Sequence, residues 1–145
     1  MPALSACFDT SALIDLLEQD APRHAAALAA FQRYKTSGMV FVTDVIFAEA
    51  SIGMPSAAAL RTALDELGID RLSSDDDDAL YHAGQTFKAY KRAKGEGKKD
   101  GVLPDFMIGA LAQAHGLALV TFNEKDFVSR FPDLEVIVPA PYARR

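Results

Sequence analysis

One stretch near the carboxyl end, residues 103–127, carries three structural signals in a single line. Pro104 suits the first turn of a helix, where its missing N–H has no partner, and Gly116 suits the left-handed residue that ends a helix. Apolar residues recur between them at helical spacing, which predicts a helix over residues 104–115. Residues 117–120 form an unbroken apolar run, typical of a strand buried on both faces. This combination favours an α/β domain whose parallel sheet is covered by helices on both sides.

Polar residues follow this strand at its carboxyl end. The segment 121–126 contains Asn123 and Asp126, and open α/β sheets bind their ligands just beyond the carboxyl ends of the strands. Asp105 stands in the first turn of the preceding helix, where the helix dipole favours a negative charge. These carboxylate and amide oxygens predict a cation site at this edge of the sheet.

A second acidic junction lies near the amino terminus. Residues 6–8 are apolar and predict a strand, Asp9 follows at once, and a helical pattern of leucine and isoleucine begins after Ser11. Asp9 therefore occupies the same kind of position as Asn123 and Asp126. The alternative interpretation, that Asp9 or Thr10 only caps the helix, is also physically sound.

The remaining chain continues the alternation of strands and helices. Strands are expected over residues 39–42, 69–72 and 136–138, and helices over residues 22–37, 45–52, 57–67 and 75–94. Ser74 and Asp77 are spaced like a capping box at the start of the last of these helices. The chain has 145 residues, 50% of them hydrophobic, which is enough for one domain with a substantial core. We therefore expect a single three-layer α/β/α domain over residues 1–145, with a mainly parallel central sheet.

Glu49 is out of place in an apolar helix. Val45 and Ile52 flank it on one face of the expected helix, so its carboxylate should turn toward the interior. Carboxylates are almost never fully buried without a partner, so an inward Glu49 indicates a functional role. The alternative is that Glu49 lies at the border of the apolar stripe and reaches water.

The charge of the chain is distributed unevenly. The net charge of −5 argues against non-specific binding of nucleic acid by the whole surface. Between residues 85 and 100, however, six lysines and arginines face two acidic residues, which leaves this glycine-rich segment at +4. Lys94, Lys98 and Lys99 are thus placed to steer phosphate groups toward Asp105, and a purely solvated loop is the alternative.

Cysteine usage and hydropathy indicate the compartment. The single cysteine, Cys7, sits in an apolar run, which excludes a disulfide framework and fits a reducing environment. No segment approaches the roughly 18 apolar residues of a membrane helix, and the amino terminus lacks the pattern of a signal peptide. We expect a cytoplasmic protein that does not bind membranes.

The acidic residues should meet at one end of a parallel sheet. Four carboxylates in a partly dry cleft repel one another unless they take up protons or bind cations, and oxygen-only ligands suit Mg²⁺ or Mn²⁺ rather than Zn²⁺. Such ions generate hydroxide and neutralise the charge of an attacked phosphate. The constellation therefore indicates metal-dependent hydrolysis of a phosphodiester. Its members are Asp9, Glu49, Asp105 and Asp126, with Asn123 beside them.

Four segments together resemble the PIN domain. They are residues 8–14 (FDTSALI), the inward Glu49, residues 103–112 (LPDFMIGALA) and residues 119–127 (LVTFNEKDF). More narrowly, they are similar to the VapC ribonuclease toxins of bacterial toxin–antitoxin pairs. The likeness spans essentially the whole chain, and the order and spacing of the segments are specific.

The resemblance implies an endoribonuclease that depends on Mg²⁺ or Mn²⁺, forms a homodimer and is inhibited by a small VapB-type antitoxin. Carried over by position, Asp9, Glu49 and Asp105 match the three most characteristic acids of the family, and Thr10 or Ser11 would assist through hydroxyl contacts. Many members carry aspartate at the position of Asn123. Asn123 would then be a neutral ligand, and Asp126 would supply the charge through water.

Two other functions compete with this interpretation. Phosphatases of the haloacid dehalogenase type also begin with an aspartate at the end of a strand, but they need a second aspartate where this chain has Ser11. A non-catalytic PIN-like module that binds RNA or protein is the more serious alternative, because the set of acids is imperfect.

Overall fold

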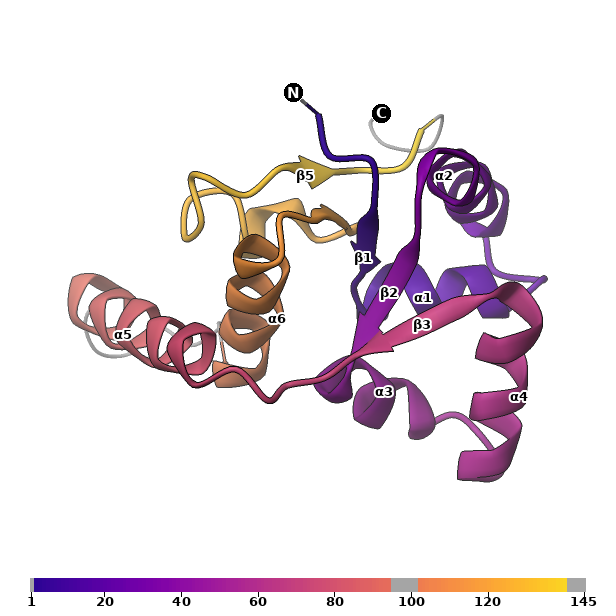
Figure 1. The fold of residues 1–145 in the computed structure, drawn as a ribbon, viewed down its shortest axis with the longest axis horizontal. Coiled ribbons are helices and arrows are strands. Elements are labelled where there is room, and N and C mark those ends of the chain that lie inside the picture. Colours follow the sequence, from indigo (N-terminus) through magenta and orange to yellow (C-terminus); the bar gives the residue numbers. More distant parts are fainter. Residues whose placement is uncertain (1, 95–101, 141–145) are drawn as a thin grey trace.

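A single parallel sheet forms the centre of the molecule. The computed structural model describes residues 2–94 and 102–140, with Lys94 described by its backbone alone. The strands lie in the order β3-β2-β1-β4-β5 (Figure 1), and every neighbouring pair is parallel, as the sequence predicts. Their bounds are β1 (Ala6–Phe8), β2 (Val40–Thr43), β3 (Ile69–Leu72), β4 (Ala118–Val120) and β5 (Val136–Ile137).

Helices connect these strands. Those of the described residues are α1 (Thr10–Leu17), α2 (His24–Ser37), α3 (Asp44–Ser51), α4 (Ala57–Leu67), α5 (Asp77–Lys94), α6 (Leu103–Ala114) and the short 3-10 helix η1 (Glu124–Asp126). The chain runs outward from β1 to β3, then crosses back through α5 and α6 to β4 and β5. Helices α1 to α4 connect β1 to β2 and β2 to β3, whereas α5 and α6 connect β3 back to β4. Crossovers of this kind are right-handed as a rule, so the two groups of helices are expected on opposite faces of the sheet. The direction of winding therefore reverses between β1 and β4, which is the topological switch point.

The core lies on both sides of β1 and β4. Every residue of these two strands is buried, and Cys7 of β1 is a buried thiol whose pKa is raised by desolvation. Gly109 lets the ring of Phe131 pack directly against the backbone of α6, because a Cβ at this position would lie 2.4 Å from a ring carbon of Phe131. Gly116 ends the helical segment with a φ of +67°, the left-handed conformation expected from its place after α6.

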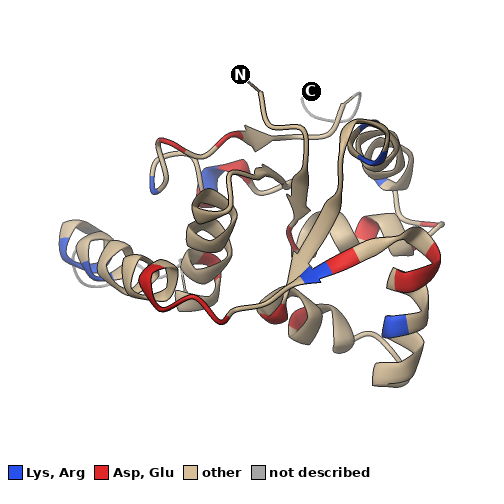
Figure 2. Ribbon diagram, viewed as in Figure 1, with Lys and Arg blue, Asp and Glu red and all other residues tan. Residues whose placement is uncertain are grey.

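The start of α5 differs from the expected capping box. Asp76 accepts a hydrogen bond from the backbone N–H of Ala79 at 3.0 Å, so Asp76 is the capping side chain and the helix begins at Asp77. Ser74 is instead held toward α3, where its N–H donates to Asp44 at 3.2 Å. The expected pair of Ser74 and Asp77 is therefore wrong, because a tertiary contact takes up Ser74. Figure 2 shows acidic residues at the start of α5 and basic residues toward its far end.

Within residues 2–94 and 102–140, no helix combines the length and apolar character needed to span a bilayer.

Candidate acidic site at the switch point

Asp9 lies where β1 meets α1, and the residue is 4% exposed. One oxygen accepts the N–H of Ala12 at 2.9 Å and the hydroxyl of Ser11 at 2.7 Å, and the other accepts the hydroxyl of Thr121 at 2.5 Å. The Ala12 contact makes Asp9 the N-cap of α1. The side chain is thus oriented by donors from both sides of the switch point.

The charge of Asp9 is nevertheless poorly compensated. Burial raises the pKa of Asp9 to about 6, although the hydrogen bonds from Thr121, Ala12 and Ser11 lower it, and the charge of Asp105 raises it further. A carboxylate that keeps a raised pKa despite three donors lies in a dry and negative environment. Such an environment favours a proton or a cation.

Thr121 is a site residue that sequence reasoning missed. Its hydroxyl donates to Asp9 and accepts the backbone N–H of Asn123 at 2.8 Å. Phe8 and Val120 are register partners, so Asp9 and Thr121 come next on adjacent parallel strands. Pairing of β1 with β4 in this register could have identified Thr121 from the sequence. A hydroxyl residue directly after one buried strand lies beside the residue that follows the neighbouring strand, which here is Asp9.

Ser11 and Thr10 hold other parts of the site together. The Ser11 hydroxyl, which donates to Asp9, also accepts the N–H of Phe122 at 3.1 Å. The Thr10 hydroxyl donates to Glu49 at 2.5 Å. The two hydroxyls expected near the substrate therefore tie the start of α1 to the loop after β4 and to α3.

Glu49 reaches the site from α3, but not for the expected reason. Its side chain is half-buried, with Thr10 as partner, whereas Ile52 is 87% exposed. Helix α3 ends at Ser51, so Ile52 does not extend an inward stripe. Glu49 points inward because α3 packs against α1. The apolar pattern within α3 does not predict that contact.

Asp105 links the acidic residues electrostatically. It stands in the first turn of α6, and its pKa is raised first by burial, then by the charges of Asp126 and Glu49, while the charge of Arg130 opposes these effects. Asp105 in turn acts on Asp9. The four carboxylates thus belong to one electrostatic group.

The remaining candidates are placed less directly. Asn123 is exposed, and its backbone N–H, which bonds to Thr121, joins it to the group. Asp126 lies in η1, 4.0 Å from the guanidinium of Arg130. Lys98 and Lys99 lie outside the described residues, and the side chain of Lys94 is not described either.

A hydrated Mg²⁺ fits this donor set. Among residues 2–94 and 102–140, no three His, Cys, Asp or Glu side chains come close enough to enclose a metal ion by themselves. Mg²⁺ usually keeps several waters and is held by one or two carboxylates, so a closed protein cage is not its ordinary site. The oxygen-only chemistry and the raised pKa values of Asp9 and Asp105 agree with such an ion.

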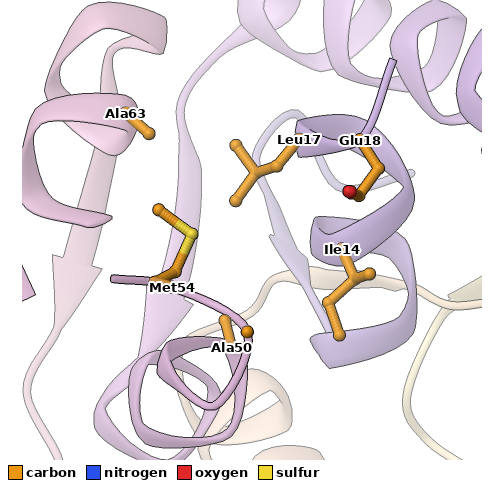
Figure 3. A pocket seen from close by; sticks show the side chains of 7 residues that line it. Ile14, Leu17, Glu18, Ala50, Met54 and Ala63 are labelled. Carbon is orange, nitrogen blue, oxygen red and sulfur yellow. The ribbon is translucent and has the colours of Figure 1, made fainter. Parts of the chain in front are cut away.

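An apolar groove of about 350 Å³ opens beside the amino-terminal helices. Figure 3 shows Ile14 and Leu17 of α1 facing Met54 and, on α4, Ala63. Ile14 is 42% exposed. The groove is thus a largely apolar surface, and Glu18 is the acidic residue in its lining.

The fold and the site define an all-parallel α/β domain with an acidic centre at its switch point. The chain belongs to the PIN domain family, whose family model matches residues 6–132. A comparison with curated protein sequences gives no match.

Solved structures with the same fold include toxin–antitoxin complexes. VapBC2 from Rickettsia felis, bound to a promoter DNA fragment, has a TM-score of 0.70 at 14% identity, covering 93% of this chain and 98% of that chain. A toxin–antitoxin complex from Klebsiella pneumoniae has a TM-score of 0.65 at 25% identity, covering 96% and 99%. VapC20 from Mycobacterium tuberculosis, a toxin that cleaves the sarcin-ricin loop, has a TM-score of 0.50 at 17% identity, covering 77% and 84%.

Proposed function

We propose that the chain is a Mg²⁺- or Mn²⁺-dependent endoribonuclease that acts in the cytoplasm as the toxin of a VapBC-type pair. The observation that carries this proposal is the coupling of buried Asp9 to Asp105, and of Asp105 to Glu49 and Asp126, at the switch point of a PIN domain. The similarity to solved toxin–antitoxin structures supports the assignment to a toxin.

In this proposal the acids would hold the ion, which would supply activation of water and neutralisation of charge at the attacked phosphodiester. Glu49, Asp105 and Asp126 are partly exposed and would be the carboxylate ligands, and buried Asp9 would complete the acidic group. Asn123 offers a neutral oxygen. No covalent nucleophile is needed.

Hydroxyls and lysines would contact the RNA. Thr10 and Ser11 keep Glu49 and Asp9 oriented, and each hydroxyl retains an acceptor lone pair for a 2′-hydroxyl of the substrate. Lys94, Lys98 and Lys99 would attract the phosphate backbone toward the site.

A VapB-type antitoxin is the proposed partner. An apolar segment of that partner would cover the groove between α1 and α4, where Ile14 and Leu17 offer apolar surface. A homodimer is proposed from the family resemblance.

Cleavage of RNA with and without metal tests the proposed function. The purified protein, free of antitoxin, should degrade RNA with Mg²⁺ or Mn²⁺ and stop when EDTA is added. Asp105→Asn and Glu49→Gln keep the side-chain shapes but remove charge, so each should lower the cleavage rate by at least about tenfold. Asp65→Asn, at an exposed position on α4, is the matched control and should cleave like the parent.

The same experiment separates the enzyme from the competing module. RNA that is bound equally well with Mg²⁺ and with EDTA, and never cut, would identify a non-catalytic binding domain. Cleavage that continues in EDTA would contradict the metal-dependent mechanism.

A further inference from the structure

Arg130 is a buried cation beside the acidic site. It follows η1 in the chain, and only 8% of its side chain is exposed. Its guanidinium carbon lies 4.5 Å from the ring centre of Tyr90 on α5 and 4.6 Å from that of Phe106 on α6. The side chain is thus clamped between two helices by aromatic faces, which attract cations.

The pairing of this cation is unusually loose. Its ion-pair partner in the described residues is Asp126, at 4.0 Å, and Nη1 is buried without a hydrogen-bond partner. A buried charge normally needs a close, hydrogen-bonded counter-ion. No close contact therefore neutralises the charge of Arg130, and the charges of Asp126 and Asp105 act on it from a distance.

Asp105 is the second acid that interacts with the charge of Arg130. It precedes Phe106, on which Arg130 is stacked, and the Arg130 charge lowers the pKa of Asp105 against the effects of burial and of Asp126. Asp105 and Asp126 come from α6 and η1, and their mutual repulsion would push these elements apart.

We propose that Arg130 is a positioning residue that holds Asp105 and Asp126 near each other while no metal is bound. This inference rests on the proposed function, because it assigns Arg130 a task at the proposed metal site. A fixed positive charge that stabilises the metal-free group must also oppose an incoming divalent cation. Arg130 therefore limits metal affinity while it preserves the arrangement of the acids.

The sign of the effect on metal binding separates this task from simple packing. A residue that only packs α5 against α6 would disturb the acids when replaced, so metal binding would weaken. Removal of an opposing charge, in contrast, should tighten metal binding even though the metal-free protein becomes less stable.

Two substitutions separate charge from stacking. Arg130→Met keeps an unbranched stem between the aromatic rings but removes the charge, and Arg130→Lys keeps the charge but loses the planar stack. Arg92→Gln removes an equal charge from an exposed position on α5 and is the control. Mn²⁺ affinity is measured by titration calorimetry, and thermal unfolding is measured in EDTA and in Mn²⁺.

For Arg130→Met we expect Mn²⁺ to bind about tenfold more tightly and the melting temperature in EDTA to fall by about 5 °C, with recovery in Mn²⁺. Arg130→Lys should bind Mn²⁺ like the parent, and Arg92→Gln should change neither quantity. Arg130→Gln is the second charge-free variant, in case the Met variant does not fold.

The outcomes distinguish the two levels of the proposal. A parent that fails to bind Mn²⁺ would overturn the proposed function and this inference together. A parent that binds Mn²⁺, with charge-free variants that bind equally or more weakly, would overturn the role of Arg130 alone. Tighter binding by Arg130→Lys would also overturn it, because the charge would then be irrelevant.

Discussion

Asp9 both caps α1 and belongs to the acidic group, whereas the sequence alone offers these two roles as alternatives. One oxygen caps α1 through Ala12, while the carboxylate as a whole faces Thr121 and senses Asp105. A strand, an aspartate and a helix are the same pattern for a cap and for a ligand, so the pattern alone does not separate the two. The difference lies in burial and in the charges of other elements.

The raised pKa of Asp9 makes stability depend on pH in the metal-free protein. The pKa rises from 3.8 to about 6 on folding. The free energy of unfolding therefore falls as the pH rises from 3.8, and the loss is complete once the pH is above about 6. The shift corresponds to about 3 kcal/mol between pH 4 and pH 7. Asp9→Asn keeps an oxygen for the Ala12 cap and should remove this loss.

Urea unfolding in EDTA from pH 4 to 8 measures the effect. The free energy of unfolding of Asp9→Asn, relative to the parent, should increase with pH across this window, and Asp65→Asn should follow the parent. A difference between Asp9→Asn and the parent that is constant with pH would show that Asp9 ionises in the fold as it does in the unfolded chain.

The sequence reveals acids more readily than the groups that orient them. Asp9 and Asp105 stand out because each borders a clear strand or helix, and both lie in one electrostatic group. Thr121 was missed because its task depends on the register of β1 against β4. Glu49 was identified, but Ile52, which suggested its direction, is exposed.

At the scale of elements, α6 depends on a close approach to the segment that follows η1. Phe131 lies against Gly109 and next to the ring of Phe106, at 6.2 Å between ring centres. A methyl group at Gly109 would meet the Phe131 ring at 2.4 Å, and a buried ring has little room to move. Glycine is needed here for space rather than for its backbone freedom.

Two glycine-to-alanine substitutions in helices should therefore have opposite effects. Gly109→Ala should destabilise the protein by about 1–3 kcal/mol through overpacking. Gly84→Ala in α5, where a Cβ would meet nothing within 4 Å, should stabilise it by about 0.5–1 kcal/mol through helix propensity. Denaturant unfolding of the two variants checks this, and equal signs would show that Phe131 yields easily.

Element types were predictable, but their ends were less so. The strand Ile69–Leu72 and the helix Ala57–Leu67 match the expected bounds, because the helical pattern extends to Leu67 and Gly68, with a φ of +70°, separates the two elements. The ends of α3 and α5 differ, since a cap or a last turn is decided by neighbouring elements. Asp44, for example, takes up the N–H of Ser74.

At the scale of the whole molecule, the alternation of strands and helices in the sequence predicted the parallel sheet. It did not predict the surfaces that several helices form together. The apolar groove is assembled from α1, the end of α3 and the turn after it, and α4, and no single amphipathic pattern predicts it. Surfaces built from several helices depend on packing angles, which sequence periodicity does not supply.

The groove gives a prediction about the proposed antitoxin. Ile14→Glu places a charge on its exposed wall, so the affinity for the antitoxin should fall by at least about tenfold while the free protein still cleaves RNA. Leu4→Glu, at a position 67% exposed outside the groove, is the control. Unchanged antitoxin binding, measured by calorimetry, would place the partner on another surface.

The balance of charge over the molecule leads to the last prediction. An acidic site in a protein of net charge −5 repels the phosphates of RNA unless positive charge lies nearby. Basic residues gather toward the far end of α5 (Figure 2), where Lys88, Lys91 and Arg92 are exposed. In the sequence, Lys94, Lys98 and Lys99 follow them. Replacing Lys94, Lys98 and Lys99 with Ala should weaken RNA binding and flatten its salt dependence, by up to about 0.7 in the logarithmic slope for each lost contact with single-stranded RNA.

Metal affinity and melting temperature of this triple variant should stay near those of the parent. As a control, the double variant Arg33→Ala with Arg61→Ala, on α2 and α4, should leave the salt slope unchanged. A triple variant with the parent's affinity and slope would mean that the RNA follows another path.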